Sequence, residues 1–196
     1  MTTPAAPPQR RLRSVQVLTL LIIIGAFAGT LYVLGDPARR AQLEQLIQSP
    51  SGLLVLFVIS AISNATLILP VPGLALTALA ATVAPPLLVG IVAGSGQTLG
   101  EMTGYLAGYS GQTLIDERPR YARLVGWMRR FGPAAIFVLA LIPNPVFDVA
   151  GIIAGALRMP VWLYLLAAGS GKVLKNIGVA YGAAFGIEWL KQIFGG

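Results

Sequence analysis

The sequence predicts an all-α polytopic membrane protein, in which an inverted repeat of two re-entrant helical hairpins is combined with transmembrane helices. The first observation is composition, since 56% of the 196 residues are hydrophobic and only 11% are charged. Soluble domains carry about 25% charged residues because water must wet their surface, so much of this chain must face lipid. The second observation is that prolines interrupt two long apolar stretches, and the third is that these stretches resemble each other.

The N-terminus divides into a basic tail and an apolar segment. Residues 1–13 are rich in proline and arginine and are expected to be disordered, whereas residues 14–34 carry no charge. About 20 apolar residues cross the hydrocarbon core, so 14–34 is predicted to be the first transmembrane helix. A cleaved signal peptide is the alternative, because arginines precede the apolar run and Ala26-Phe27-Ala28 is similar to a cleavage site.

A polar, partly helical connector at 35–50 leads to the first interrupted stretch. Its two apolar legs, 53–69 and 74–84, are separated by residues that end a helix, because proline lacks an N–H and clashes with the preceding turn. At membrane depth the freed carbonyls must face protein or water, which a re-entrant hairpin allows. A full crossing by 53–69 stays open, since this leg is nearly long enough. The interrupting residues are Pro70, Pro72 and Gly73.

The second apolar stretch starts at 132 and has the same organisation. Legs 133–142 and 146–157 flank its interruption, so they are predicted to form the second re-entrant hairpin. Between the two stretches, residues 115–131 mix arginines with apolar side chains, which is typical of an amphipathic segment lying at the membrane interface. The residues of the second interruption are Pro143, Asn144 and Pro145.

Short motifs recur in both stretches in the same order. "LPVPG" at 69–73 corresponds to "IPNPV" at 142–146, and "AGSG" at 93–96 corresponds to "AGSG" at 168–171, at offsets of 73 and 75. Each unit then continues into a helix with regularly spaced glycines, a pattern that favours close helix packing over a ligand role. These glycines are Gly96, Gly100, Gly104 and Gly108 in the first unit, and Gly178, Gly182 and Gly186 in the second.

The basic residues indicate how this repeat sits in the membrane. The units are expected at about 52–114 and 124–186, within one domain spanning 50–187. If the N-terminus is cytoplasmic, the first hairpin enters from outside and the arginines of 115–131 return to the inside, as the positive-inside rule requires. The second hairpin then enters from inside, so the two units have opposite orientations and their interruptions meet near the midplane.

The absence of cysteine and histidine limits the chemistry. It excludes thiol nucleophiles, Ser-His-Asp triads, zinc sites with the usual ligands, haem-ligating histidine and disulfides, so we expect no enzyme, no metal and no cofactor. The net charge of +7 comes largely from arginines beside apolar segments, which favours anionic lipid headgroups over nucleic acid as partners. These arginines are Arg10, Arg11, Arg13, Arg118, Arg120, Arg123, Arg129 and Arg130.

Ionisable residues also lie within the apolar stretches: Glu101, Asp148, Lys172 and Lys175. A charge near the bilayer centre costs about 3 kcal/mol, so these side chains are expected to face the interior, a cavity or each other. Together with Asn144 and Asn176 they are interpreted as a substrate or proton pathway, in which lysines bind an anionic headgroup and the acids carry protons. A structural ion pair, or lysines that extend to the interface, are the alternatives.

Several segments resemble the DedA family of membrane proteins with the VTT, or SNARE-associated, domain. They are "GEMTGYLAGYSG" at 100–111, "FGP" at 131–133, "IPNPVFDVAG" at 142–151 and "AGALRM" at 154–159. The resemblance implies paired re-entrant loops and the movement of phospholipids or polyprenyl phosphates, often coupled to protons, with Glu101 in the place of the family's acidic residue. The chain departs from the family at Ala140 and Val146, where bacterial members typically carry arginine.

The hypothesis is therefore a lipid flippase or scramblase in a bacterial-type cytoplasmic membrane. Its expected partners are membrane lipids with anionic headgroups, and the sequence leaves a homo-oligomer open. A small-solute or ion transporter and a non-transporting membrane scaffold are the rival functions. The sequence determines neither the lipid nor the direction of its movement.

Overall fold

The computed structural model describes residues 32, 35–49, 51–65, 73–111, 122–142 and 146–194. Every regular element in these ranges is an α-helix, as the sequence predicts. The predicted tail 1–13, nearly all of the predicted first transmembrane helix 14–34, and the prolines of both interruptions lie outside the described residues. For 187–194 the structure describes the backbone alone.

Helix α2 (Pro37–Gln48) lies within the predicted polar connector. Asp36 caps its N-terminus, where a carboxylate oxygen accepts a hydrogen bond from the Ala38 amide at 2.9 Å. The helix ends at Ser49, and α3 (Gly52–Ala65) follows after a bend of 94°. The buried residues of α3 include Leu56, Ser60 and Ser63.

The other side of the first interruption begins with α4 (Gly73–Ala80). Helix α5 (Pro86–Gly100) starts at the second proline of a pair, a position where the missing N–H costs nothing. Helix α6 (Met102–Ser110) continues α5 after Glu101, whose amide donates to the Gln97 carbonyl and whose carbonyl accepts from Tyr105. Glu101 therefore sits at a slight irregularity in an almost continuous helical rod.

Helix α7 (Ala122–Phe131) covers the second half of the predicted interfacial segment and is strongly amphipathic, with Met128 buried. At Gly132 the backbone has φ +49°, a conformation that glycine adopts without strain, and α8 (Pro133–Leu141) leaves at 117° to α7. Beyond the second interruption come α9 (Val146–Ala156) and the long α10 (Val161–Phe194).

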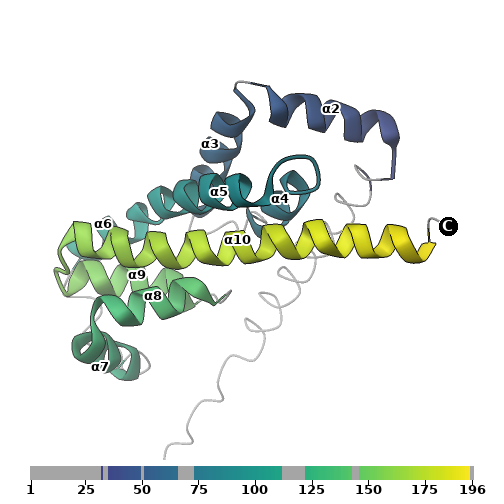
Figure 1. Cartoon of the computed structure of the whole chain (residues 1–196). Helices are drawn as coiled ribbons and strands as arrows, with labels where there is room; N and C mark the ends of the chain where they lie inside the picture. Colours follow the sequence, from purple (N-terminus) through teal and green to yellow (C-terminus); the bar gives the residue numbers. More distant parts are fainter. Residues whose placement is uncertain are drawn as a thin grey trace, which may run out of the picture.

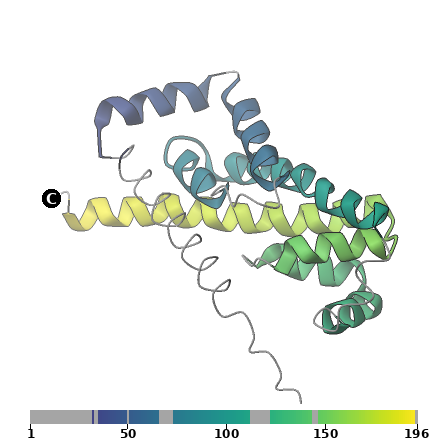
Figure 2. The ribbon, with the colours of Figure 1, turned by 180° about the vertical axis from the view of Figure 1, so that it is seen from behind.

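Helix α10 runs through the whole assembly (Figure 1). It packs against α5, α8 and α4, while α3 packs against α5 and α6 packs against α9. Figure 2 shows the same arrangement from behind, with α3, α4 and α5 on one side of α10 and α8 and α9 on the other. Helices α5 and α10 therefore form a central pair that joins the two halves of the chain.

Glycines allow two pairs of helices to approach until their backbones touch. A Cβ at Gly94 would lie 2.5 Å from the Val173 Cα, which brings α5 against α10. At the crossing of α6 and α9, a Cβ on Gly108 would overlap the Ile152 carbonyl, and a Cβ on Gly155 would overlap the Tyr105 carbonyl. Small residues at such positions permit the close approach that membrane helices use for packing.

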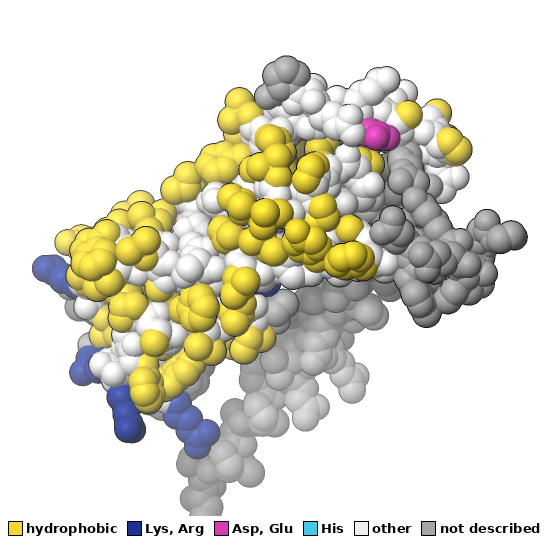
Figure 3. Space-filling model, in the orientation of Figure 1, with side chains coloured by type: hydrophobic (Ala, Val, Ile, Leu, Met, Phe, Trp, Pro, Cys, Tyr) yellow, Lys and Arg dark blue, Asp and Glu magenta, His cyan; other side chains and the backbone are white. Residues whose placement is uncertain are grey.

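The surface carries many large apolar side chains, and its charges are segregated. Figure 3 shows hydrophobic side chains over much of one face, with Lys and Arg side chains gathered at the end where α7 lies. No single helix of the described ranges combines the length and apolarity needed to cross a membrane. Two helix pairs bent at short breaks, α2 with α3 and α7 with α8, reach that length and composition together.

Candidate functional site

A buried ion pair lies between the two central helices. The Nζ atom of Lys172, in the middle of α10, is 2.7 Å from Oε1 of Glu101, at the junction of α5 and α6. The two residues are only 2% and 4% exposed. Charges are retained at such depth when they are paired and hydrogen-bonded, because an isolated charge would lose its hydration without compensation.

Residues near the end of α3 and the start of α9 meet at this lysine. Asn64, next to the last residue of α3, accepts a hydrogen bond from Lys172 Nζ at 2.9 Å. Across the interruption, a Cβ on Gly73 would lie 3.5 Å from the Asn64 amide nitrogen. From the other half of the chain, the ring of Phe147, near the start of α9, lies 4.8 Å from Nζ, within the range of a cation–π interaction.

One helical turn further along α5 and α10, a pair of amide side chains lies next to the ion pair. The hydrogen-bonded polar residues of this region are called the polar layer: Asn64, Thr77, Gln97, Glu101, Lys172 and Asn176. Gln97 and Asn176 exchange two hydrogen bonds, each 3.0 Å long, and the Asn176 amide also donates to the Lys172 carbonyl at 2.8 Å. The Thr77 hydroxyl on α4 lies 2.9 Å from Asn176 Oδ1 and equally close to the Gly73 carbonyl, so it donates to one of them. All these polar groups have partners, as burial in a low-dielectric interior requires.

The ion pair and the amide pair occupy positions that correspond in the two sequence units. Gln97 and Lys172 each follow an AGSG motif directly and are 75 residues apart, as are Glu101 and Asn176. The contact of Glu101 with Lys172 therefore corresponds to the contact of Asn176 with Gln97, with the roles of the two units exchanged.

The glycines of the AGSG motifs repeat this reciprocity. Gly94 of the first motif faces Val173, and Gly169 of the second motif faces Thr98. Gly94 and Gly169 are 75 residues apart, and so are Thr98 and Val173. A Cβ on Gly169 would lie 3.6 Å from the Thr98 side chain, an ordinary packing distance.

Comparison with known proteins assigns the family. A model of the VTT domain, which is the domain of the DedA family, matches residues 71–185. The chain belongs to the DedA family. Searches of curated proteins and of solved structures found no match to the chain. The VTT domain therefore contains the whole polar layer except Asn64, and its family is membrane-associated.

The VTT domain brings three of the predicted pathway residues together: Glu101, Lys172 and Asn176. Asp148 instead lies on an exposed face of the first turn of α9, and Lys175 is half-buried. Neither of these two forms a hydrogen bond or ion pair with another described residue. Asn144 belongs to the second interruption and lies outside the described part of the chain.

The glycines predicted to serve packing differ between the two predicted sequence units. In the first unit, a Cβ at Gly96 or Gly100 would overlap the backbone of α3, and one at Gly108 would overlap α9, while Gly104 has ordinary packing distances. In the second unit, a Cβ at Gly178, Gly182 or Gly186 would meet nothing within 4 Å in the described ranges. The described helices therefore give no packing reason for glycine at these three positions.

Sequence reasoning missed Gln97 and Thr77 of the VTT domain as site residues. A signal for Gln97 was present, because it follows the first AGSG motif as Lys172 follows the second. Thr77 carried no such signal, since a threonine in an apolar helix is ordinary. Within the described ranges, no cluster of three or more acidic side chains gathers where a metal ion could bind. The polar layer offers one ammonium, one carboxylate, three amides and one hydroxyl, a set suited to binding a charged headgroup or moving a proton.

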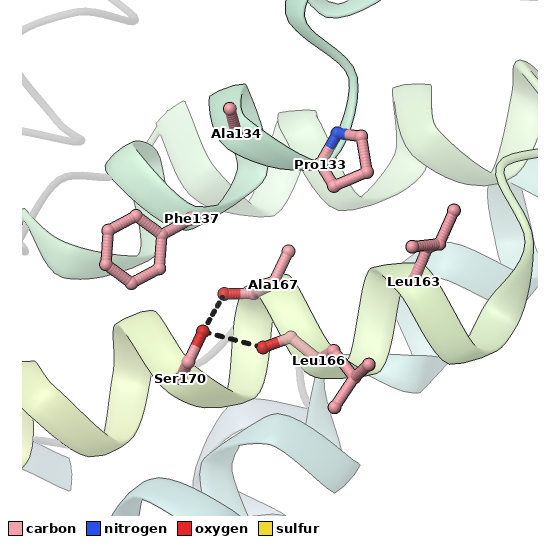
Figure 4. Close-up of a pocket in the computed structure, with 7 residues that line it drawn as sticks. All are labelled: Pro133, Ala134, Phe137, Leu163, Leu166, Ala167 and Ser170. Atoms are coloured by element: carbon pink, nitrogen blue, oxygen red, sulfur yellow. Dashed lines mark hydrogen bonds between the residues drawn. The ribbon is translucent and has the colours of Figure 1, made fainter.

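An apolar groove lies on the outer face of the VTT domain, between the start of α8 and α10. Its volume is about 330 Å³, and its one polar side chain, Ser170, hydrogen-bonds to the carbonyls of Leu166 and Ala167 on its own helix (Figure 4). The groove therefore presents hydrocarbon to its surroundings. The other lining residues are Pro133, Ala134, Phe137 and Leu163.

Proposed function

We propose that this DedA-family protein is a membrane lipid transporter, a flippase or scramblase, whose polar layer contacts the headgroup of the moving lipid. The observation that carries the proposal is the buried Lys172–Glu101 pair, which is contacted by Asn64 near the end of α3 and by Phe147 near the start of α9. A charge in an apolar chain is costly and needs a reason beyond packing. A headgroup pathway supplies that reason.

The chemistry of the pair suits an anionic headgroup. A lipid phosphate would compete with the Glu101 carboxylate for the Lys172 ammonium, because both are oxygen anions. Protonation of Glu101 would release Lys172 for the phosphate, and loss of that proton would return the lysine to Glu101. This exchange would couple lipid movement to protons, and it needs no metal or cofactor.

The reciprocal contacts support an inverted repeat as the framework of transport. In the first unit α3 packs on α5 and α4 packs on α10, while in the second unit α8 packs on α10 and α9 packs on α6. Each second hairpin leg thus packs on the long helix of the other unit. Transporters with inverted repeats carry their site between the units, and the polar layer lies between them here.

The lipid tails need an apolar route beside the polar one. The groove between α8 and α10 is apolar, and the exposed side chain of Leu166 and the partly buried ring of Phe137 border it. We infer that acyl chains slide along this outer surface while the headgroup passes the polar layer. The N-terminus would face the cytoplasm, with the arginines of α7 on the same side.

The experiment is lipid exchange in reconstituted vesicles. The purified chain is placed in liposomes that contain fluorescent phosphatidylglycerol or phosphatidylethanolamine, and dithionite quenches the label in the outer leaflet. The wild-type protein is expected to make the inner-leaflet label accessible, whereas Glu101→Gln returns the signal to that of protein-free vesicles. Glu44→Gln is the matched control, because Glu44 is exposed on α2.

Two results would contradict the proposal. Wild-type protein that is folded but exposes no additional label indicates a scaffold. Full activity in both Glu101→Gln and Lys172→Met would exclude the polar layer as the headgroup route. The second candidate is a small-solute or ion transporter, favoured by the compact, fully enclosed ion pair, and it predicts ion flux through the same vesicles without lipid movement.

A further inference from the structure

The hydroxyl of Tyr164 is buried without a hydrogen-bond partner in the described structure. Tyr164 lies in the first turn of α10 and is 0% exposed. Its phenol oxygen is one of two buried side-chain polar atoms in the described ranges that lack a partner. Burying an unsatisfied hydroxyl is unfavourable, so such groups in native proteins usually face a bound water or a functional partner.

The surroundings of this hydroxyl point to Glu101. A Cβ built on Gly151 of α9 would lie 3.0 Å from the Tyr164 hydroxyl and 3.8 Å from Oε2 of Glu101. Both oxygens therefore flank the position that a side chain at residue 151 would occupy. Lys172 binds the other carboxylate oxygen, Oε1, so Oε2 is the oxygen turned toward Gly151.

The tyrosine ring is held firmly in this position. Tyr105 stacks on it with ring centroids 4.9 Å apart, and the Tyr105 hydroxyl donates to the carbonyl of Met159. Tyr105 therefore holds the phenol ring in place and has its own hydroxyl proton engaged elsewhere. The Tyr164 hydroxyl points toward Gly151 and has no hydrogen-bond partner among the described residues.

We propose that a bound water occupies the space beside Gly151 and bridges the Tyr164 hydroxyl to Oε2 of Glu101. A buried water needs at least two polar partners, and the Tyr164 hydroxyl and Oε2 of Glu101 supply two of them beside a residue that has no side chain. Tyr164 is then a positioning residue, because it holds Glu101 through the water while Lys172 holds it from the opposite side. Its role in lipid movement rests on the proposed function, whereas the water bridge itself does not.

The position of this water also gives the proton of Glu101 a defined route. Lys172 occupies Oε1, so a proton that arrives on the carboxylate binds at Oε2, where the bridging water can deliver it. The corresponding residue of the other sequence unit, Asn176, has no such gap, because its Oδ1 lies 2.9 Å from the Thr77 hydroxyl. In this arrangement the Glu101 carboxylate contacts a water molecule, as a group that exchanges protons requires, whereas the Asn176 amide has a side-chain hydroxyl within reach.

The test measures the bridge without depending on transport. In Tyr164→Phe we expect the Tm of the detergent-solubilised protein to fall by about 3 °C, since a satisfied hydrogen-bond network has lost a member. We also expect the infrared carboxylate band that Glu101→Gln removes to shift in Tyr164→Phe. Tyr181→Phe, on an exposed tyrosine of the same helix, is the control and should change neither.

Two substitutions at one position complete the test. Gly151→Ala fills the space with a methyl group and should shift the same infrared band, whereas Gly151→Ser supplies a hydroxyl and should restore it. An unchanged or higher Tm in Tyr164→Phe, or an unshifted band, overturns the proposal, because the hydroxyl would then have no partner to lose. Lipid exchange in vesicles distinguishes the two proposals. If the wild type exchanges lipid and Tyr164→Phe does so at the same rate, the positioning role is refuted while the proposed transport function stands.

Discussion

Gln97 and Asn176 face each other across the central helix pair and exchange two hydrogen bonds, each 3.0 Å long. Asn176 uses its whole amide, because its second N–H donates to the Lys172 carbonyl and its oxygen also lies within reach of the Thr77 hydroxyl. This amide pair and the Lys172–Glu101 pair form one polar layer. The layer separates two apolar clusters, one around Val89 and Ala180 and the other around Tyr105 and Tyr164.

Removal of the Asn176 amide should destabilise the fold. Asn176→Leu leaves both polar groups of the buried Gln97 side chain without partners, at a cost of about 1–3 kcal/mol for each such group. The measurement is the free energy of unfolding of the detergent-solubilised protein. Thr77→Val is the milder comparison, since the amide pair stays intact. Equal stability of Asn176→Leu and the wild type would show that water reaches this layer.

Breaking the ion pair from one side should cost more than removing it altogether. Lys172→Met leaves the Glu101 carboxylate buried and unpaired, and we expect a loss of about 3–5 kcal/mol in the free energy of unfolding. Glu101→Gln combined with Lys172→Met removes both charges and should recover most of that loss. Lys175→Met is the control, because Lys175 pairs with no described residue. A double variant no better than the single one would contradict the pairing.

An added methyl group at the crossing of α6 and α9 should force these helices apart. Gly108→Ala and Gly155→Ala each place a Cβ on a backbone carbonyl, and overpacking of this kind costs about 1–3 kcal/mol or more. Gly126→Ala on α7 meets nothing within 4 Å in the described ranges and should raise stability by about 0.5–1 kcal/mol. Thermal unfolding of the three variants measures these effects. Equal Tm values for all three would contradict the close contact of α6 with α9.

The absence of cysteine makes the lipid-facing surface accessible to a clean labelling experiment. Leu166→Cys, at a side chain that is 64% exposed in the isolated chain, should resist a membrane-impermeant maleimide in intact vesicles, because lipid covers it. Arg123→Cys, exposed on the amphipathic α7, should react from one side of the membrane only. Rapid labelling of Leu166→Cys would place the groove in water and remove the proposed acyl-chain route.

The helical character and the positions of several elements were predictable from the sequence. Prolines, glycines and apolar runs act locally, so the starts of α5, α8 and α10 and the amphipathic α7 follow from the chain itself. Three residues of the candidate site, Glu101, Lys172 and Asn176, were also predicted from the sequence. Glu101 and Lys172 stood out because a charge within apolar sequence is costly in lipid and is expected to face the interior, a cavity or another charge.

The choice of partners was decided only by tertiary packing. Lys172 and Asn176 are four residues apart and share a face of α10, whereas Lys175 is turned by roughly 100° from Asn176. On α9 the same rotation turns Asp148 away from the buried Phe147 and toward the surface. The face of α10 that points inward is the one that packs against α5. This packing includes the close approach at Gly94, a contact between residues far apart in sequence. The sequence by itself therefore determined that buried charges exist in a helical membrane-family protein, and the packing of α5 against α10 determined that Glu101 meets Lys172.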